Sequence, residues 1–152
     1  MTMATFHGVG ERSMTVHVGR LGELLHTEPW GGQGRILVVE DDRASREVLA
    51  EILTLEGCEV RAAADGAEAL AIVQEWPPSL ILLDLRMPEM DGYAFARRYR
   101  ELPVQQAPIV LLSASWESAE AVEAIGAVEA VDKPFRIDDL LEVVERYSPC
   151  SD

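Results

Sequence analysis

The sequence predicts an α/β fold in which a parallel sheet is covered by helices on both faces. The first observation behind this prediction is that short apolar runs recur along the chain, as expected of strands that are buried on both faces. The second is that segments with apolar residues at helical spacing separate these runs. Strand–helix units in succession form parallel strands joined by right-handed crossovers, which gives a doubly wound sheet.

Five strands are expected from residue 35 onward. Three of them are unbroken apolar runs, at residues 36–39, 80–83 and 109–112. The other two, at residues 58–63 and 127–131, occupy the matching places in the alternation. Short runs that end at polar or turn-forming residues are typical of strands rather than of helices.

Five helices are expected between and after these strands. The first has apolar residues three and four positions apart and ends at Gly57, and the second ends before Pro77. The last has its apolar residues on one side, as a helix that packs against a sheet requires. The expected helices lie at residues 44–56, 66–76, 93–101, 116–125 and 137–147.

Residues 1–34 differ from the rest of the chain. They contain all three histidines, several glycines and no sustained helical or strand pattern, so we expect a flexible N-terminal extension. The domain is expected at residues 35–147, with a C-terminal tail at residues 148–152. The histidines, at positions 7, 17 and 26, are too scattered to predict a metal site.

The composition is that of a globular protein with one domain. The chain has 152 residues, of which 48% are hydrophobic and 26% charged, and its formal net charge is −14. This charge argues against binding to nucleic acid or to an anionic membrane. No apolar run has the length of a membrane span, and the N-terminus lacks the pattern of a signal peptide. Cys58 and Cys150 form neither a ligand pair nor a disulfide framework, which favours a reducing cytoplasm.

Polar side chains follow four of the five predicted strands. Glu40 and Asp41 come after the first strand, Asp84 after the third, Ser113 after the fourth and Lys133 after the fifth. Because ligands of parallel sheets bind at the carboxyl ends of the strands, these side chains are expected to converge there. Three adjacent carboxylates favour a bound Mg²⁺, and a hydroxyl and an ammonium beside them suit the oxygens of a phosphoryl group.

Each of these residues has an ordinary structural explanation when it is taken alone. The neighbouring Asp42 is expected to cap the first helix rather than bind a cation. Lys133 could be a surface lysine, but it is the only lysine among 13 basic residues, and arginine and lysine do not substitute freely at a phosphate. The prediction therefore depends on the four strand ends together.

Three segments resemble motifs of one known family. The sequence DLRMPEMDG from Asp84 to Gly92 resembles the D-x-x-M-P-x-M-D-G signature of bacterial response-regulator receiver domains. ILVVED at residues 36–41 resembles their acidic pocket, and VDKPF at residues 131–135 resembles their K-P-F turn. The resemblance covers about residues 35–147, and it implies a flavodoxin-like fold of five strand–helix units with strand order 2-1-3-4-5.

The resemblance implies a role for each matching residue. Asp84 corresponds to the phosphoacceptor, Lys133 to the lysine that binds the phosphoryl group, and Ser113 to the hydroxyl that moves toward it. Asp41 corresponds to a direct ligand of Mg²⁺. The full set of implied metal ligands is Glu40, Asp41, Asp84 and the backbone carbonyl of Arg86.

The implied function is that of a single-domain response regulator in a two-component system. It would accept a phosphoryl group from a histidine kinase or a histidine phosphotransfer protein, and act as a phosphorelay shuttle or sink or as a switch for a downstream protein. The chain ends a few residues after Tyr147, so no output domain is expected to follow. No enzymatic activity is expected beyond self-phosphorylation and self-dephosphorylation.

Two features depart from the family pattern. Ala130 stands three residues before Lys133, where the family usually has Tyr or Phe, and the spacing from Ser113 to Lys133 is about two residues shorter than usual. Both changes fall on the face that normally carries the output signal. We therefore expect intact phosphoryl chemistry and altered signalling through that face.

Two other functions fit parts of the sequence. A phosphatase of the haloacid dehalogenase type also phosphorylates an aspartate, but it needs a second acid two residues later, where this chain has Arg86. An interaction module that does not depend on phosphorylation is favoured by Ala130. The presence of every residue of the phosphoryl site argues against that alternative.

Overall fold

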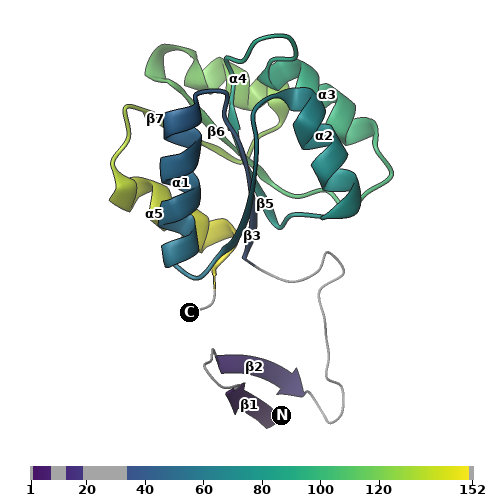
Figure 1. Ribbon diagram of the computed structural model, residues 1–152, viewed down its shortest axis with the longest axis vertical. Helices are drawn as coiled ribbons and strands as arrows, with labels where there is room; N and C mark the ends of the chain where they lie inside the picture. The colour runs from purple at the N-terminus through teal and green to yellow at the C-terminus, as the bar shows by residue number, and fades with distance from the viewer. Residues whose placement is uncertain (1, 8–12, 19–33, 151–152) are drawn as a thin grey trace.

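The computed structural model describes residues 2–7, 13–18 and 34–150. Residues 34–150 contain a five-stranded parallel sheet flanked by helices (Figure 1). Its spatial order is β4-β3-β5-β6-β7, which confirms the predicted doubly wound, flavodoxin-like order 2-1-3-4-5. The strands are β3 (Arg35–Val39), β4 (Glu59–Ala63), β5 (Leu80–Asp84), β6 (Ile109–Ala114) and β7 (Glu129–Lys133).

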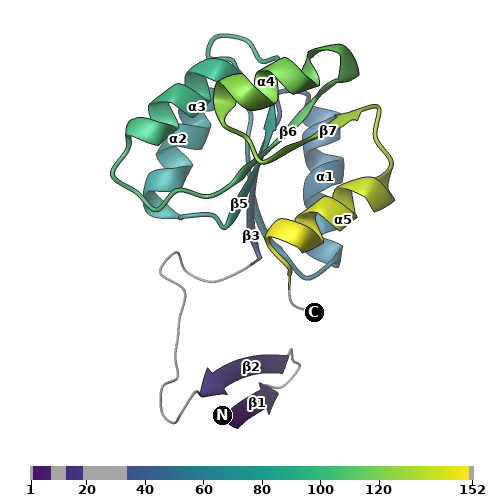
Figure 2. The same ribbon diagram turned by 180° about the vertical axis from the view of Figure 1, so that it is seen from behind.

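Helices cover both faces of this sheet. Helices α1 and α5 lie over one face, and α2, α3 and α4 lie over the other (Figures 1 and 2). No helix in the described part of the chain has the length and apolar character of a membrane span. The helices are α1 (Arg43–Leu55), α2 (Gly66–Glu75), α3 (Gly92–Glu101), α4 (Ser118–Ile125) and α5 (Ile137–Tyr147).

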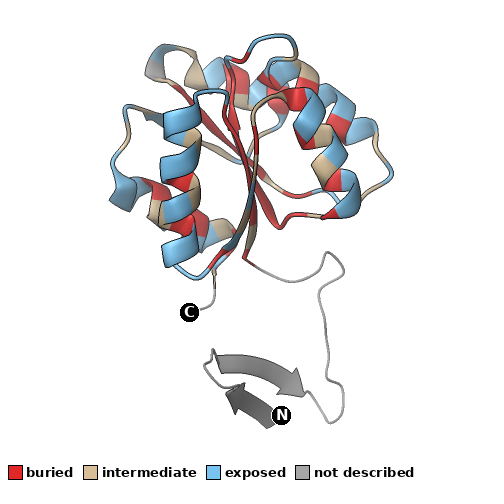
Figure 3. Ribbon diagram, viewed as in Figure 1, coloured by how far each residue is buried: buried red, intermediate tan, exposed pale blue. Residues whose placement is uncertain are grey.

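The central strands are buried on both sides, which explains their unbroken apolar runs (Figure 3). Successive residues point to opposite faces, so that Leu37 packs in the core under α2, α3 and α4, whereas Val38 packs in the core under α1 and α5. The same alternation holds in β5 and β6. The carboxyl ends of the strands are thereby fixed at one edge of a rigid sheet.

Three of the helices have an aspartate as their N-cap residue. Each accepts a hydrogen bond from the backbone N–H group three residues later, at 2.8 to 2.9 Å. Asp42 has this role in α1, which confirms the prediction that it caps the helix. The other two N-cap residues are Asp65 in α2 and Asp91 in α3.

The sheet's last strand is displaced from its predicted position. β7 begins at Glu129 rather than at residue 127, because the Ala127 N–H still donates to the Val122 carbonyl of α4 at 3.0 Å. Chain segment Ser115–Glu117 forms a 3-10 helix ahead of α4, where an α-helix was expected from residue 116. The strand also ends later than predicted, so that Lys133 is its last residue instead of the second residue beyond it.

The N-terminal segment contains a β-hairpin that was not predicted. β1 (Thr2–His7) pairs antiparallel with β2 (Ser13–Val18). The sequence has no sustained strand pattern in either segment; a two-stranded hairpin is only marginally stable, and its sequence signal is correspondingly weak. The rest of the predicted extension at residues 1, 8–12 and 19–33 lies outside the described residues.

Cys58 and Cys150 form a disulfide, so the expectation that they are unpaired is wrong. Cys58 lies just before β4 and Cys150 just after α5, and both border the core under α1 and α5. Their sequence separation is 92, and only the fold brings them together. The correction removes the argument for a reducing compartment that depended on unpaired cysteines.

Replacing Cys150 with Ser is expected to lower the free energy of unfolding of the oxidised protein by about 3–4 kcal/mol, because a cross-link over so long a loop restricts the unfolded chain. Chemical denaturation with and without dithiothreitol measures this effect. The reduced parent is the matched control and should unfold like Cys150→Ser. Equal stability of the oxidised and reduced parent would contradict the prediction.

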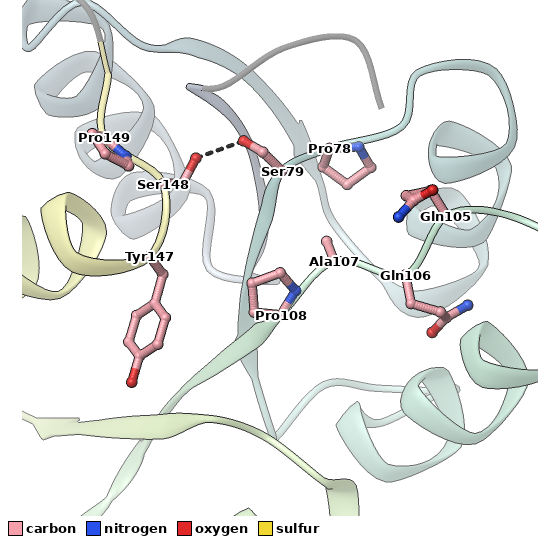
Figure 4. A pocket seen from close by; sticks show the side chains of 9 residues that line it. All are labelled: Pro78, Ser79, Gln105, Gln106, Ala107, Pro108, Tyr147, Ser148 and Pro149. Atoms are coloured by element: carbon pink, nitrogen blue, oxygen red, sulfur yellow. Dashed lines mark hydrogen bonds between the residues drawn. The ribbon is translucent and has the colours of Figure 1, made fainter. Parts of the chain in front are cut away.

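The end of α5 is anchored at the edge of the sheet where the strands begin. The Ser148 and Ser79 hydroxyls form a hydrogen bond at 2.5 Å (Figure 4). Ser148 also accepts a hydrogen bond from the Gly34 N–H at 3.2 Å. A cavity of about 150 Å³ beside them is lined by Pro78, Pro108 and other residues of this edge. This cavity is therefore at the opposite end of the strands from the predicted site.

Candidate functional site

The predicted acidic residues converge at the carboxyl ends of β3 and β5. Glu40 and Asp41 follow β3 directly, and Asp84 is the last residue of β5, the strand beside it. Carboxylate oxygens of the three residues all lie within 4.8 Å of one another. The sheet order changes direction at β3, so the cluster occupies the crevice where doubly wound folds bind ligands.

Lys133 extends from β7 toward the two buried carboxylates. Its Nζ atom lies 3.3 Å from Oδ1 of Asp84 and 3.5 Å from Oε1 of Glu40. Asp84 is 4% exposed and Glu40 is 3% exposed, whereas Lys133 is partly open to solvent. An ammonium in this position partly offsets the repulsion between the carboxylates and leaves room for an incoming anion.

Burial raises the pKa of Glu40 above its ordinary value, and the nearby Asp84 carboxylate acts in the same direction. The Asp42 N–H, which donates to Glu40 at 3.1 Å, lowers the pKa by less than burial raises it, and Lys133 also lowers it. Because the folded state binds this proton more tightly than the unfolded state, the resulting stabilisation is present at low pH and is lost as pH rises through the raised pKa. Protons therefore compete with a cation for Glu40 at a higher pH than they do for an ordinary glutamate.

The loop that follows Asp84 explains the signature motif in structural terms. Met87 is buried in the core, and Asp91 caps α3. A Cβ atom at Gly92 would lie 3.0 Å from the Asp84 carbonyl oxygen and from the Leu85 Cα atom, so any other residue would push the main chain of this loop apart. These residues hold the loop around Asp84.

The main chain and the side chain of Arg86 contact different parts of the site. Its N–H donates to Oδ1 of Asp84 at 3.3 Å, so its backbone lies beside the predicted acceptor. Its guanidinium instead forms an ion pair with Glu117 at 3.0 Å and lies 5.2 Å from the centroid of the Trp116 ring. The side chain thus joins the loop after β5 to the 3-10 helix after β6.

Ser113 lies at the end of β6 and is 2% exposed. Its hydroxyl lies 2.9 Å from the Ser118 hydroxyl, which donates to Oδ1 of Asp132 at 2.6 Å. Neither Ser118 nor Asp132 was predicted as a site residue. Their contact depends on the 3-10 turn before α4, which the sequence pattern did not indicate.

Ala130 lies in the middle of β7 and is half-buried. Its small side chain packs against the core under α2, α3 and α4. A methyl group therefore stands where the family usually has an aromatic ring, so this position has no ring that could change its orientation.

An apolar groove adjoins the acidic cluster. It has a volume of about 570 Å³ and runs between α1 and the segment after β7. Val48 of α1 is 51% exposed in it, and Ile137 is also exposed. Among its other lining residues are Ala44, Ser45, Pro134 and Phe135, beside Lys133.

Comparisons with known proteins agree with this geometry. The response regulator receiver domain family matches residues 36–145. Response regulator MprA from Mycobacterium sp. strain KMS is 39% identical over 121 residues, which cover 76% of this chain and 52% of that protein. The chain spans between 24% and 52% of the length of the curated relatives that it matches.

Solved structures with the same fold match the domain almost in full. Vibrio cholerae chemotaxis protein CheY4 is 31% identical, with a TM-score of 0.65 over 76% of this chain and 99% of that one. The receiver domain of sensor histidine kinase PA1611 from Pseudomonas aeruginosa is 29% identical, with a TM-score of 0.68 over 77% and 98%, and has a magnesium ion coordinated in its active site cleft. The chain belongs to the response regulator receiver domain family of two-component signalling.

Proposed function

We propose that this protein accepts a phosphoryl group on Asp84 from a phosphohistidine, in a reaction that requires Mg²⁺. The observation that carries the proposal is that Asp84 belongs to the acidic cluster and lies 3.3 Å from the Lys133 ammonium. An oxygen of the Asp84 carboxylate attacks phosphorus, the bond from phosphorus to the donor nitrogen breaks, and the imidazole leaves. The product is an acyl phosphate.

The chain offers a ligand set that fits Mg²⁺. Glu40, Asp41 and Asp84 supply carboxylate oxygens within 4.8 Å of one another, and the carbonyl of Arg86 is a further proposed ligand on the main chain that borders Asp84. Hard oxygen ligands with space for water and phosphate oxygens suit this ion. When bound, Mg²⁺ neutralises charge on the transferring group.

In this proposal, Lys133 and Ser113 donate hydrogen bonds to the phosphoryl oxygens that Mg²⁺ does not bind. The Lys133 ammonium already donates a hydrogen bond to Asp84. It needs to move little to donate to an oxygen of a phosphoryl group on Asp84 instead. Ala114, next to Ser113, is small and leaves the acyl phosphate accessible to water. Hydrolysis would then return the domain to its resting state.

The donor protein is proposed to dock on the groove between α1 and the segment after β7. Its exposed apolar side chains lie beside Lys133, where a donor histidine must approach Asp84. With Ala130 in place of an aromatic residue, a role as a phosphorelay shuttle or sink, or as a switch read near Ser113, fits better than signalling through a moving ring.

Replacing Val48 with Asp is expected to slow phosphotransfer from a phosphorylated histidine phosphotransfer protein by about tenfold, because a charge would be buried at the interface. Labelling by acetyl phosphate should be unchanged. Leu55→Asp is the matched control, since Leu55 is 79% exposed on the same helix but outside the groove. If both variants slow the transfer equally, the groove is not the docking site.

One experiment tests the proposed function directly. Incubation with acetyl phosphate and Mg²⁺ should add a single phosphoryl group, seen as a gain of about 80 Da by intact mass spectrometry. Chelation of Mg²⁺ by EDTA should prevent the gain. No gain in the presence of Mg²⁺ would favour the alternative of a phosphorylation-independent interaction module, for which Ala130 is the supporting observation.

A further inference from the structure

Two side chains that were not predicted as site residues, Ser118 and Asp132, hold the Ser113 hydroxyl in place. Ser118 is the first residue of α4, and its hydroxyl lies 2.9 Å from the Ser113 hydroxyl and 2.6 Å from Oδ1 of Asp132. Asp132 lies opposite Ser113 in the pairing of β6 with β7. The three side chains thus link the end of β6, the start of α4 and the end of β7, elements that lie side by side in Figure 2.

The number of hydroxyl protons limits how many hydrogen bonds Ser113, Ser118 and Asp132 can form together. Each serine hydroxyl has one proton to donate, whereas an ionised carboxylate only accepts. The 2.6 Å contact assigns the proton of Ser118 to Asp132, with the Ala114 carbonyl at 3.1 Å as a weaker acceptor. The contact between the two hydroxyls must then use the proton of Ser113.

A phosphoryl group on Asp84 would compete for that same proton. Phosphoryl oxygens also only accept, so Ser113 cannot donate to one of them while it donates to Ser118. If Ser113 turns to the phosphoryl group, the two serine oxygens face each other at 2.9 Å without a proton between them. That contact is repulsive unless Ser118 turns its own proton from Asp132 to Ser113, so the link from Ser113 through Ser118 to Asp132 is broken in either case.

We propose that Ser118 and Asp132 are positioning residues that hold Ser113 in its unphosphorylated state, and that phosphorylation breaks this link and shifts the first turn of α4. The inference depends on the proposed phosphorylation of Asp84. It gives the domain a route to α4 that does not need an aromatic ring at Ala130.

The local structure of α4 supports this route. The residue before the helix, Glu117, provides no side-chain cap, and its carboxylate is paired with Arg86 instead. The bond that Ser118 donates to Asp132 and the bond that it accepts from Ser113 therefore tie the first turn of α4 to β7 and β6. If Ser113 leaves Ser118, the first turn of α4 loses one of these hydrogen bonds.

Beryllofluoride with Mg²⁺, a mimic of the phosphoryl group, provides the test, with binding followed by amide shifts. Asp132→Ala should bind the mimic about two- to tenfold more tightly than Asp132→Asn, which is the size of one net hydrogen bond. Both variants remove the charge, but Asn keeps an oxygen that accepts from Ser118. Ser118→Ala should likewise bind more tightly than Ser118→Thr, which keeps the hydroxyl.

A second background separates this mechanism from a general effect on folding. With Ser113→Ala present, Asp132→Ala and Asp132→Asn should bind the mimic equally, because no hydroxyl remains to be released. A difference that persists in this background, or none in the parent background, would overturn the inference. Failure of the parent protein to bind beryllofluoride at all would instead contradict the proposed function.

Discussion

Replacing Asp84 with Asn is expected to abolish the mass gain that acetyl phosphate and Mg²⁺ produce. The amide is a far weaker nucleophile than the carboxylate, so it does not form a bond to phosphorus. Asn also occupies nearly the same volume in this buried position, which is 4% exposed, and the apolar strand around it should fold unchanged. Intact mass spectrometry measures the outcome without any need for the partner protein.

A matched control is available in the same loop. Asp91→Asn removes the same charge a few residues away, and asparagine caps helices as well as aspartate does. This variant should therefore gain phosphate like the parent. If Asp84→Asn gains as much mass as Asp91→Asn, another side chain is the acceptor and the assignment is wrong.

Much of the site could be predicted because each part has a local signal. The strands of the sheet centre are unbroken apolar runs, and the polar residues at their ends mark one edge of the sheet. Parallel pairing then brings Glu40, Asp84 and Lys133 together, although 93 residues separate the first and the last. The parallel topology of the sheet, and not closeness in the sequence, places these three residues at one site.

The features that were missed depend on contacts without a local pattern. The disulfide joins Cys58 to Cys150, which are far apart in sequence and meet at the core under α1 and α5. The link from Ser118 to Asp132 needs both the late start of β7 and the 3-10 turn before α4. Neither follows from periodicity, since each depends on where a neighbouring element begins.

The motif residues also divide into two groups that sequence alone does not separate. Asp84 and Lys133 lie at the proposed chemistry, whereas Met87, Asp91 and Gly92 shape the loop that surrounds it. A substitution at Gly92 would therefore disturb the site through the backbone. Variants in the second group report on folding of the loop and are poor tests of phosphoryl transfer.

Replacing Asp41 with Ala is expected to weaken Mg²⁺ binding by at least about tenfold, since even groups that only orient ligands contribute that much. Asp41 is the exposed member of the acidic cluster and the one that an entering cation meets first. Phosphorylation by acetyl phosphate should slow accordingly at limiting Mg²⁺. Titration with Mg²⁺, followed by tryptophan fluorescence or amide shifts, gives the affinity.

The same substitution should leave the metal-free protein at least as stable as the parent. Removing one of three clustered carboxylates relieves the repulsion expected among them, so the melting temperature without Mg²⁺ should be equal or higher. Loss of affinity together with unchanged or raised stability separates a ligand from a residue that merely supports the fold. A fall in melting temperature would point to the second role.

Asp42→Asn is the control that isolates ligation from local charge. It removes a negative charge next to Asp41, and the asparagine still caps α1 by accepting from the Ser45 N–H. If nearby charge alone attracts the cation, the two variants should weaken Mg²⁺ binding to a similar extent, and the assignment of Asp41 would fail. If Asp41 binds the ion directly, Asp42→Asn should lose much less affinity, and the difference should persist at high salt because screening removes only the long-range part.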